Sequence, residues 1–180
     1  MLICDKLIQR GFSAIELMVV LAVAIILLAI GIPSVQAMIR HQQITTTVND
    51  FFASIHLARS EAIQHGIRVD LVPSDGAGDW SKGWVIFVDG NNNQRPDKGE
   101  RIVFSHDRAH HGIRITAALT DSKVQYLAYH GSGRTRTNTS SQQTQFGTLT
   151  FQLDNQTRKI KLNFLGRPRV CNPDTERSTC

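Results

Sequence analysis

The stretch RGFSAIELMVVLAV, residues 10–23, decides how this chain begins. Lys6 and Arg10 are the basic residues at its start, and residues 17–39 carry no charged side chain. A helix needs about 20 mostly apolar residues to cross the hydrocarbon core of a membrane. Because basic flanks remain on the cytoplasmic side, we expect residues 1–11 in the cytoplasm and the remainder of the chain to be exported.

Glu16 is the lone acid near the start of this apolar run. A carboxylate within a membrane segment is costly and therefore indicates a functional partner. Gly11 ends the charged leader, and no small-x-small cleavage site of an ordinary secretory signal follows the apolar run. The alternative is a signal anchor whose glutamate only lies at the membrane interface.

Residues 10–23 resemble the class III signal of type IV prepilins and type II secretion pseudopilins. The resemblance implies that a prepilin peptidase cuts after Gly11 and that the new N-terminal residue, Phe12, is N-methylated. It also implies that Glu16 pairs with the N-terminal amine of a neighbouring subunit during assembly. A buried carboxylate and a buried amine offset each other's desolvation penalty, so such a pair sets the register between subunits.

The apolar segment continues into an amphipathic helix. Pro33 follows the densest apolar run and is expected to kink the helix. Beyond it, apolar residues recur at spacings of three and four, which predicts one buried face. They are Ile44, Val48, Phe51 or Phe52, Ile55, Ala58 and Ala62. Gly66 ends the pattern, so we expect one helix over residues 13–64, with Arg40, Arg59 and Glu61 on its solvent side.

After Gly66 the sequence consists of short β-like runs separated by turn residues. We expect strands over residues 68–72, 83–89, 101–105, 113–118, 124–130, 147–153 and 159–164. The fold class is therefore α+β, with a long N-terminal helix packed on an antiparallel β-sheet or sandwich. This divides the chain into a leader (1–11), a transmembrane and filament-core half-helix (12–39) and a globular domain (40–180). That domain consists of the amphipathic half-helix (40–65) and the β domain (67–180).

The later motifs resemble the FimT/GspH family in particular. ARSEAIQHGIRV resembles that family's helix end and first strand, and KGWVIFVDGNNN resembles its next hairpin. GTLTFQLDNQTRKIKLNFLGRPR resembles its final strand pair and terminal glycine-arginine turn. The resemblance implies the type IV pilin fold for nearly the whole mature chain.

The C-terminal quarter of the chain is basic. It holds eight basic and three acidic residues from Arg134 onward, a surplus equal to the net charge of +5 of all 180 residues. In the strand over 159–164, Ile160, Leu162 and Phe164 alternate with polar residues, which predicts a core face and a wet face carrying Lys159 and Lys161.

A glycine-arginine turn follows that strand. Gly166 permits the turn, and Pro168 stiffens the segment that carries Arg167 and Arg169. A second glycine-arginine turn, with Arg134 and Arg136, would extend the basic strip. The polar segment 132–145 around it is either one long loop or two strand ends joined by a loop.

The cysteines predict a disulfide rather than a metal site. Cys4 lies in the leader, which leaves Cys171 and Cys180 as a pair closing a short loop. Such a pair forms a disulfide in an oxidising compartment. Two cysteines without nearby histidines supply only half of a zinc site. We expect no metal and no other cofactor.

Arginine suits phosphate through its planar, bidentate fork, so the basic strip predicts DNA binding, although a solvated basic face is the plainer interpretation. In the FimT branch a C-terminal GRxR motif is associated with DNA capture, and the resemblance carries that role to Gly166, Arg167 and Arg169. Tyr126, Tyr129 and Phe146 form no clear stacking arrangement in the sequence, so we expect binding to the DNA backbone, sensitive to salt and tolerant of sequence.

Two further patterns carry weaker hypotheses. The run DGNNNQRPDKGE, residues 89–100, places acids and amides at calcium-loop positions, but Gln94 replaces the required glycine, so a polar hairpin loop is favoured over a calcium site. His106, His110 and His111 follow no known ligand spacing and are interpreted as loop residues; near the arginines they would strengthen DNA binding at acid pH. No nucleophile elbow, phosphate-binding loop or zinc-protease motif occurs, so we expect no enzyme.

The expected function is that of a type IV pilus minor pilin that binds DNA non-specifically through the GRxR turn during natural transformation. Its expected partners are DNA, other pilins, the prepilin peptidase and, before assembly, the inner membrane. The domain is expected first in the periplasm, on a single-pass anchor, and then in a pilus at the cell surface. The alternative is a structural or priming minor pilin, or a secretion pseudopilin, without DNA binding.

Overall fold

A computed structural model describes residues 13–138, 143–176, 178 and 180. The chain divides into two compact units, residues 1–39 and 40–180, which are described separately. In the first unit the described residues belong to the start of helix α1 (Ala14–His65). The predicted cleavage and methylation residues, Gly11 and Phe12, lie outside the described residues.

The first part of α1 is apolar on all sides. Ser13 accepts a hydrogen bond from the Glu16 N–H at 3.3 Å, the geometry of an N-terminal cap. The helix continues through Pro33. Within the described residues, α1 is the one helix long and apolar enough to cross a membrane, and its most apolar segment is not buried by the rest of the chain.

The second part of α1 has the predicted buried face. Its fully buried positions recur every three or four residues and include Ile44, Val48, Phe51, Ile55, Ala58 and Ala62. The helix ends where predicted, because Gly66 adopts the left-handed φ of 66° that favours glycine.

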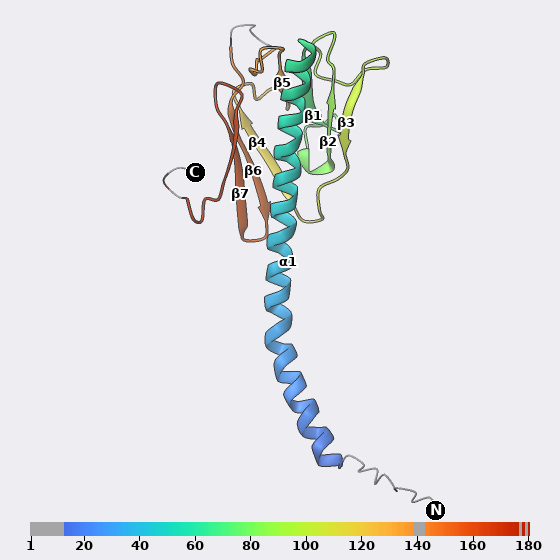
Figure 1. Cartoon of the computed structure of the whole chain (residues 1–180), viewed down its shortest axis with the longest axis vertical. Coiled ribbons are helices and arrows are strands. Elements are labelled where there is room, and N and C mark those ends of the chain that lie inside the picture. Colours follow the sequence, from blue (N-terminus) through green and yellow to red (C-terminus); the bar gives the residue numbers. More distant parts are fainter. Residues whose placement is uncertain (1–12, 139–142, 177, 179) are drawn as a thin grey trace, which may run out of the picture. The chain divides into compact units, whose positions relative to one another are not determined.

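Two four-stranded antiparallel sheets pack against this part of the helix (Figure 1). One has the order β3-β2-β1-β5 and the other the order β4-β6-β7-β8. The strands are β1 (Val69–Pro73), β2 (Trp84–Phe87), β3 (Ile102–His106), β4 (Arg114–Leu119), β5 (Leu127–Tyr129), β6 (Gly147–Leu153), β7 (Gln156–Leu162) and β8 (Pro168–Cys171). In Figure 1, β4, β6 and β7 lie on one side of the helix and β1, β2 and β3 on the other.

The structure confirms the α+β class and all seven expected strands, and it adds two elements. One is a 3-10 turn, η1 (Trp80–Lys82), and the other is β8. The sequence of β8 predicts a turn, because Gly166 and Pro168 interrupt the strand pattern. Pro168 is tolerated as the first residue of an edge strand, where its missing N–H breaks no ladder. Pairing with β7, with Lys161 opposite Arg169, makes the segment a strand.

The core joins the helix to both sheets. Phe51 of α1 lies with its ring centroid 5.3 Å from that of Trp80, 4.8 Å from Trp84 and 5.5 Å from Phe151. Ser54 accepts a hydrogen bond from the Trp84 indole at 2.8 Å, which satisfies the polar atom of a fully buried ring. This core holds the two sheets in register against the helix, and with them the loops at their ends.

One core prediction is wrong. Phe164 was expected to share the buried face of Ile160 and Leu162, but β7 ends at Leu162 and Phe164 is 66% exposed. The alternation of a strand cannot continue where the chain turns, so Phe164 loses its place on the core face.

Candidate nucleic-acid interface

The outer face of the second sheet carries the predicted basic strip. Lys161 of β7 lies directly opposite Arg169 of β8, and Lys159 lies opposite Cys171. Opposed residues in an antiparallel pair project to the same face of a sheet. Ile160 occupies the other face and is fully buried. The alternation predicted for this strand is confirmed up to Leu162.

The turn between β7 and β8 is held by a network of hydrogen bonds. The Gly166 N–H donates to the Asn163 carbonyl at 2.9 Å, and the Asn163 N–H donates to the Arg167 carbonyl at 3.2 Å. The Asn163 side-chain oxygen accepts from the N–H groups of Leu165 at 3.0 Å and Arg167 at 2.9 Å. Tyr129 donates its hydroxyl to the Gly166 carbonyl at 2.8 Å. Asn163 and Tyr129 therefore stiffen the turn, in addition to Pro168.

The second glycine-arginine turn lies against the first. A Cβ added to Gly166 would lie 3.1 Å from the Thr135 nitrogen and 3.3 Å from the Gly133 oxygen. The Gly133 N–H donates to the His130 carbonyl at 2.7 Å, and the His130 N–H donates to the Arg134 carbonyl at 3.1 Å, which defines this second turn. The structure thus brings together the turns at Gly133 and Gly166, which are more than thirty residues apart in the chain.

The arginines of the second turn point away from the core. Arg134 is exposed and Arg136 is partly exposed, while Thr135 between them is fully buried. The described ends of segment 132–145 bond to each other, since the Thr137 N–H donates to the Gln143 carbonyl at 2.9 Å. Residues 139–142, between these two ends, lie outside the described residues.

Arg59 of α1 belongs to the same region, although the sequence analysis placed it on the solvent side of the helix. A Cβ on Gly133 would lie 3.3 Å from the Arg59 Nε. That Nε is buried and has no hydrogen-bond partner in the described part of the chain. Burial raises the pKa of Tyr129, and the charge of nearby Arg59 lowers it in part. Arg59 lies four residues after Ile55 and three before Ala62, the spacing of the buried face, and this spacing could have predicted the placement.

His130 also lies in this region and was not singled out from the sequence. Burial lowers the pKa of His130, and the charges of Arg68 and Arg136 lower it further. A neutral imidazole at physiological pH adds no charge to the basic region, by which we mean the outer face of β7 and β8 together with the two glycine-arginine turns. The predicted histidines lie elsewhere: His110 contacts Gln43 at 2.9 Å, and Gln43 lies sixteen residues before Arg59 on α1, about 24 Å along the helix axis.

Of the other two predicted histidines, His111 contacts His110 through its carbonyl at 3.1 Å, and His106 is not a loop residue. It belongs to β3 and stacks on Trp84 with ring centroids 3.9 Å apart.

The loop over residues 89–100 contains hydrogen bonds among its own polar side chains, because the Asp97 carboxylate accepts from the side chains of Asn91 and Asn93 at 2.8 and 2.6 Å. Within the described residues no group of three or more histidine, cysteine, aspartate or glutamate side chains is placed to hold a metal ion.

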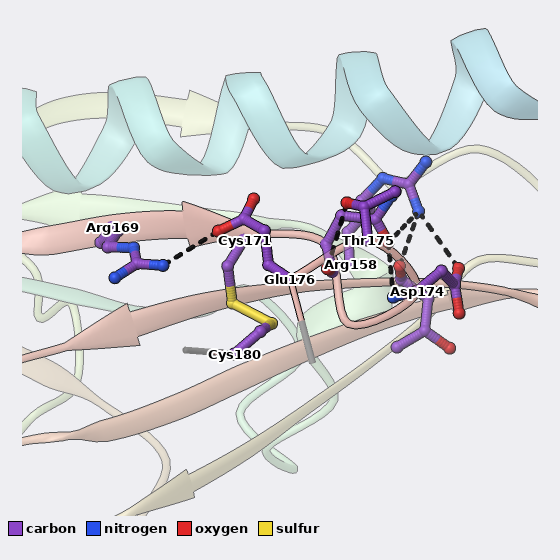
Figure 2. Close-up of a disulfide and its surroundings, with 9 residues drawn as sticks. Arg158, Arg169, Cys171, Asp174, Thr175, Glu176 and Cys180 are labelled. Carbon is purple, nitrogen blue, oxygen red and sulfur yellow. Dashed lines mark hydrogen bonds and ion pairs between the residues drawn. A yellow bond between two sulfur atoms is a disulfide. The ribbon is translucent and has the colours of Figure 1, made fainter. Parts of the chain in front are cut away.

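The C-terminal loop places acids next to the basic strip (Figure 2). Cys171 and Cys180 form the predicted disulfide, with their Cα atoms 5.7 Å apart. Inside this loop Glu176 accepts a hydrogen bond from Arg169 at 2.9 Å, and Asp174 lies 3.9 Å from Arg158. Arg169 therefore has an intramolecular partner that the sequence analysis did not assign to it.

One long helix with two antiparallel sheets is the architecture of type IV pilins and pseudopilins. Residues 47–166 match the family model described as Type II transport protein GspH, and because the match covers more than half of the chain, the chain belongs to that family. The match ends at Gly166, so Arg167 and Arg169 follow the matched residues. The chain is thus a minor pilin or pseudopilin, and its family and fold are those of structural proteins.

Similar proteins agree with this assignment. The Pilin-like protein PilA1 of Thermus thermophilus is 31% identical over 99 residues, which cover 54% of this chain and 60% of that protein. The type IV minor pilin FimU of Pseudomonas aeruginosa has a TM-score of 0.55 at 16% identity, covering 75% of this chain and 92% of that one. The minor pseudopilin EpsH from the Type 2 Secretion System of Vibrio cholerae has a TM-score of 0.53 at 13% identity, covering 73% and 98%.

Proposed function

We propose that this chain is a minor pilin of a type IV pilus that binds extracellular DNA through its basic region during natural transformation. The observation that carries this proposal is the contact between the two glycine-arginine turns. Gly166 abuts Gly133 so closely that a Cβ on Gly166 would lie 3.3 Å from the Gly133 oxygen. Arg134 and Arg167 are exposed on these adjoining turns, where both guanidiniums can reach one phosphate backbone.

The chemistry of the region favours phosphate over base edges. Lys161 and Arg169 share the outer face of the second sheet and extend the cationic surface from the turn along β7 and β8. Arginine forks pair with phosphate in a bidentate manner. In the described residues the only α-helix is α1, and its second half is packed in the core, so no helix is available to enter a major groove. We infer that the protein binds the DNA backbone without sequence preference.

The N-terminal part of the chain completes the proposal. A prepilin peptidase removes residues 1–11 by cutting after Gly11, Phe12 is N-methylated, and Glu16 pairs with the N-terminal amine of a neighbouring pilin. Residues 12–39 anchor the protein in the inner membrane and then lie in the filament core. The domain over residues 40–180 first faces the periplasm and is then displayed on the pilus.

The proposal is tested by DNA binding across salt concentrations. The full chain in a neutral detergent is titrated into fluorescent DNA, and the Arg167→Gln/Arg169→Gln double variant is compared with it. The matched control, Arg108→Gln/Arg114→Gln, removes two exposed arginines of the same domain outside the two glycine-arginine turns. We expect weaker binding and a smaller salt dependence only for the first pair. If the unaltered protein fails to bind DNA at low salt, the proposed function is wrong.

A second candidate function is a structural or priming role without DNA binding, in a pilus or in a secretion system. The ion pair between Arg169 and Glu176 favours it, because Arg169 is then satisfied without an external anion. The fold is also like that of a secretion pseudopilin. In that case Arg167 contacts a carboxylate of a neighbouring pilin. The variant Arg167→Gln then weakens co-purification with other pilins and leaves the frequency of natural transformation unchanged.

A further inference from the structure

Phe164 is the most exposed large apolar side chain that the structure describes outside the apolar part of α1, with 66% of it accessible. It stands in the turn between β7 and β8, one residue after Asn163 and three before Arg167. A phenyl ring in water is unfavourable, and the core of this domain accommodates other aromatic rings fully. The exposed ring is therefore available for a contact with another molecule.

The backbone around Phe164 is ordered before any ligand arrives. Both oxygens of Asn163 accept hydrogen bonds from the turn: the carbonyl accepts from Gly166, and the side chain accepts from Leu165 and Arg167. Tyr129 then ties the Gly166 carbonyl to the core. Because the turn is held on both sides, binding through Phe164 costs little ordering of the backbone.

The surroundings of Phe164 are cationic. Arg167 is exposed on the same turn, and the adjoining turn presents exposed Arg134. A second pilin is the plain occupant for an exposed phenyl ring, but the charge around this one favours an anionic partner. An aromatic face among phosphate-binding cations is the combination that binds single-stranded nucleic acid, where bases stack on the ring and the cations hold the backbone. In a duplex, the base faces are covered by their neighbours, so only unpaired bases can use the ring.

We propose that Phe164 is a stacking platform for an unpaired nucleobase, so that the basic region prefers single-stranded DNA, including single-stranded ends, over continuous duplex. This inference rests on the proposed DNA binding and names the form of DNA that the site takes. Arg134 and Arg167 hold the phosphates on either side of the stacked base. Duplex DNA is held by the same arginines without the stacking contact.

The test compares two probes, a fluorescent oligothymidine and a covalently closed circular duplex, on the full chain in a neutral detergent. We expect the unaltered protein to bind the single strand more tightly. Phe164→Ala should weaken single-strand binding about tenfold, the effect of losing one stacked base, and leave duplex binding unchanged. Phe164→Tyr should keep the preference, because a phenol also stacks. Phe146→Ala, which removes another exposed phenyl ring, should change neither affinity.

A spectroscopic readout separates stacking from a structural effect. In a Phe164→Trp variant the indole emission should be quenched by oligothymidine and not by the closed duplex, with the unaltered protein subtracted for Trp80 and Trp84. Thermal unfolding of each variant confirms that the fold is retained.

Four results would overturn the inference. Equal affinity of Phe164→Ala and the unaltered protein for oligothymidine, with Arg167→Gln still weakening both probes, refutes stacking but leaves the DNA function standing. An equal loss for both probes in Phe164→Ala shows a structural role, and a loss only of co-purifying pilins shows that a pilin is the occupant. If the unaltered protein binds neither probe at low salt, the proposed function itself fails.

Discussion

Arg169 and Glu176 form an ion pair within the C-terminal part of the domain, with the Arg169 Nη2 donating to the Glu176 Oε2 at 2.9 Å. Both side chains are about half exposed, so the pair contributes little to stability, about 0–1 kcal/mol. Glu176 lies inside the loop closed by Cys171 and Cys180. The same arginine is thus bound by an internal carboxylate that a phosphate group would have to displace.

Replacing that carboxylate should strengthen DNA binding. In Glu176→Gln the competing charge is gone and the local net charge rises by one, so we expect affinity to increase about two- to fivefold at low salt and the gain to shrink as salt screens the surface. Fluorescence anisotropy measures it. Asp107→Asn, which removes an exposed acid outside the C-terminal loop, is the matched control. An unchanged affinity in Glu176→Gln would show that Arg169 does not contact DNA.

The salt dependence of binding should count the phosphate contacts. Each cation that neutralises one duplex phosphate contributes about 0.9 to the slope of log affinity against log salt. We expect Arg167→Gln and Arg134→Gln each to lower the slope by about that amount. A single variant that weakens binding without changing the slope would place its arginine away from the backbone.

The contact between the two turns should be sensitive to the smallest substitution. Gly166 has a φ of 73°, and a Cβ there would lie 3.0 Å from Tyr129 and 3.1 Å from Thr135. We expect Gly166→Ala to lower the free energy of unfolding by about 1–2 kcal/mol from backbone strain, plus the contribution of the close contact, and to weaken DNA binding.

The variant Gly66→Ala separates the effect of backbone strain from the effect of the close contact. Gly66 has a similar φ of 66°, but a Cβ there would meet no atom within 4 Å. Chemical denaturation of both variants should show a larger loss for Gly166→Ala. Equal losses would mean that only the backbone conformation matters and that the turns do not press on each other.

The disulfide should stabilise the domain mainly because it closes a loop and so restricts the unfolded chain. Cys171 and Cys180 are separated by 9 positions, and closing a loop of that size restricts the unfolded chain by about 2–3 kcal/mol. The Cys171→Ser/Cys180→Ser variant should unfold at a lower temperature, and its loss of stability should match that of the unaltered protein under reducing conditions. A difference between the two would point to damage by the serines.

The pH dependence of stability should reveal the buried carboxyl of Asp70. Burial raises the pKa of Asp70 to about 7, although Arg68 donates to it and opposes the change, and nearby Asp89 adds to it. In the unfolded chain the pKa of an aspartate is about 3.9. The raised pKa means that the folded state holds this proton more tightly, so the contribution of Asp70 to stability is full below pH ~4 and declines as the pH rises towards ~7.

The variant Asp70→Asn tests this sign. The difference in unfolding free energy between the unaltered protein and Asp70→Asn should become less favourable to the unaltered protein from pH 5 to pH 8. A difference that grows in favour of the unaltered protein over that window would show that the Arg68 pair outweighs burial and lowers the pKa instead.

The parts of the fold that depend on local pattern could be predicted. The apolar start, the spacing of Ile44 to Ala62 and the stop at Gly66 are each written in neighbouring residues. Seven strands followed from alternation and turn residues. β8 could not be predicted, because Pro168 and the preceding glycine are turn residues by composition, and only the pairing with β7 makes the segment a strand.

The candidate site was predicted in composition but not in arrangement. Lys159, Lys161 and the two glycine-arginine turns were named from the sequence. The place of Arg59 beside Gly133, the pairing of Arg169 with Glu176 and the exposure of Phe164 were missed. Each of these depends on residues far apart in the chain, or on where a strand stops, and neither is encoded by periodicity.

By itself the sequence determined the apolar N-terminal helix, the α+β class and the family, because hydrophobic spacing and short motifs are local properties of a chain. The tertiary structure alone decided that the turns at Gly133 and Gly166 touch, and that Glu176 forms an ion pair with Arg169. Packing against Tyr129 and Thr135 brings the turns together, and the Cys171–Cys180 loop brings the carboxylate back to the strand. Such contacts are set by the closing of long loops in the folded core.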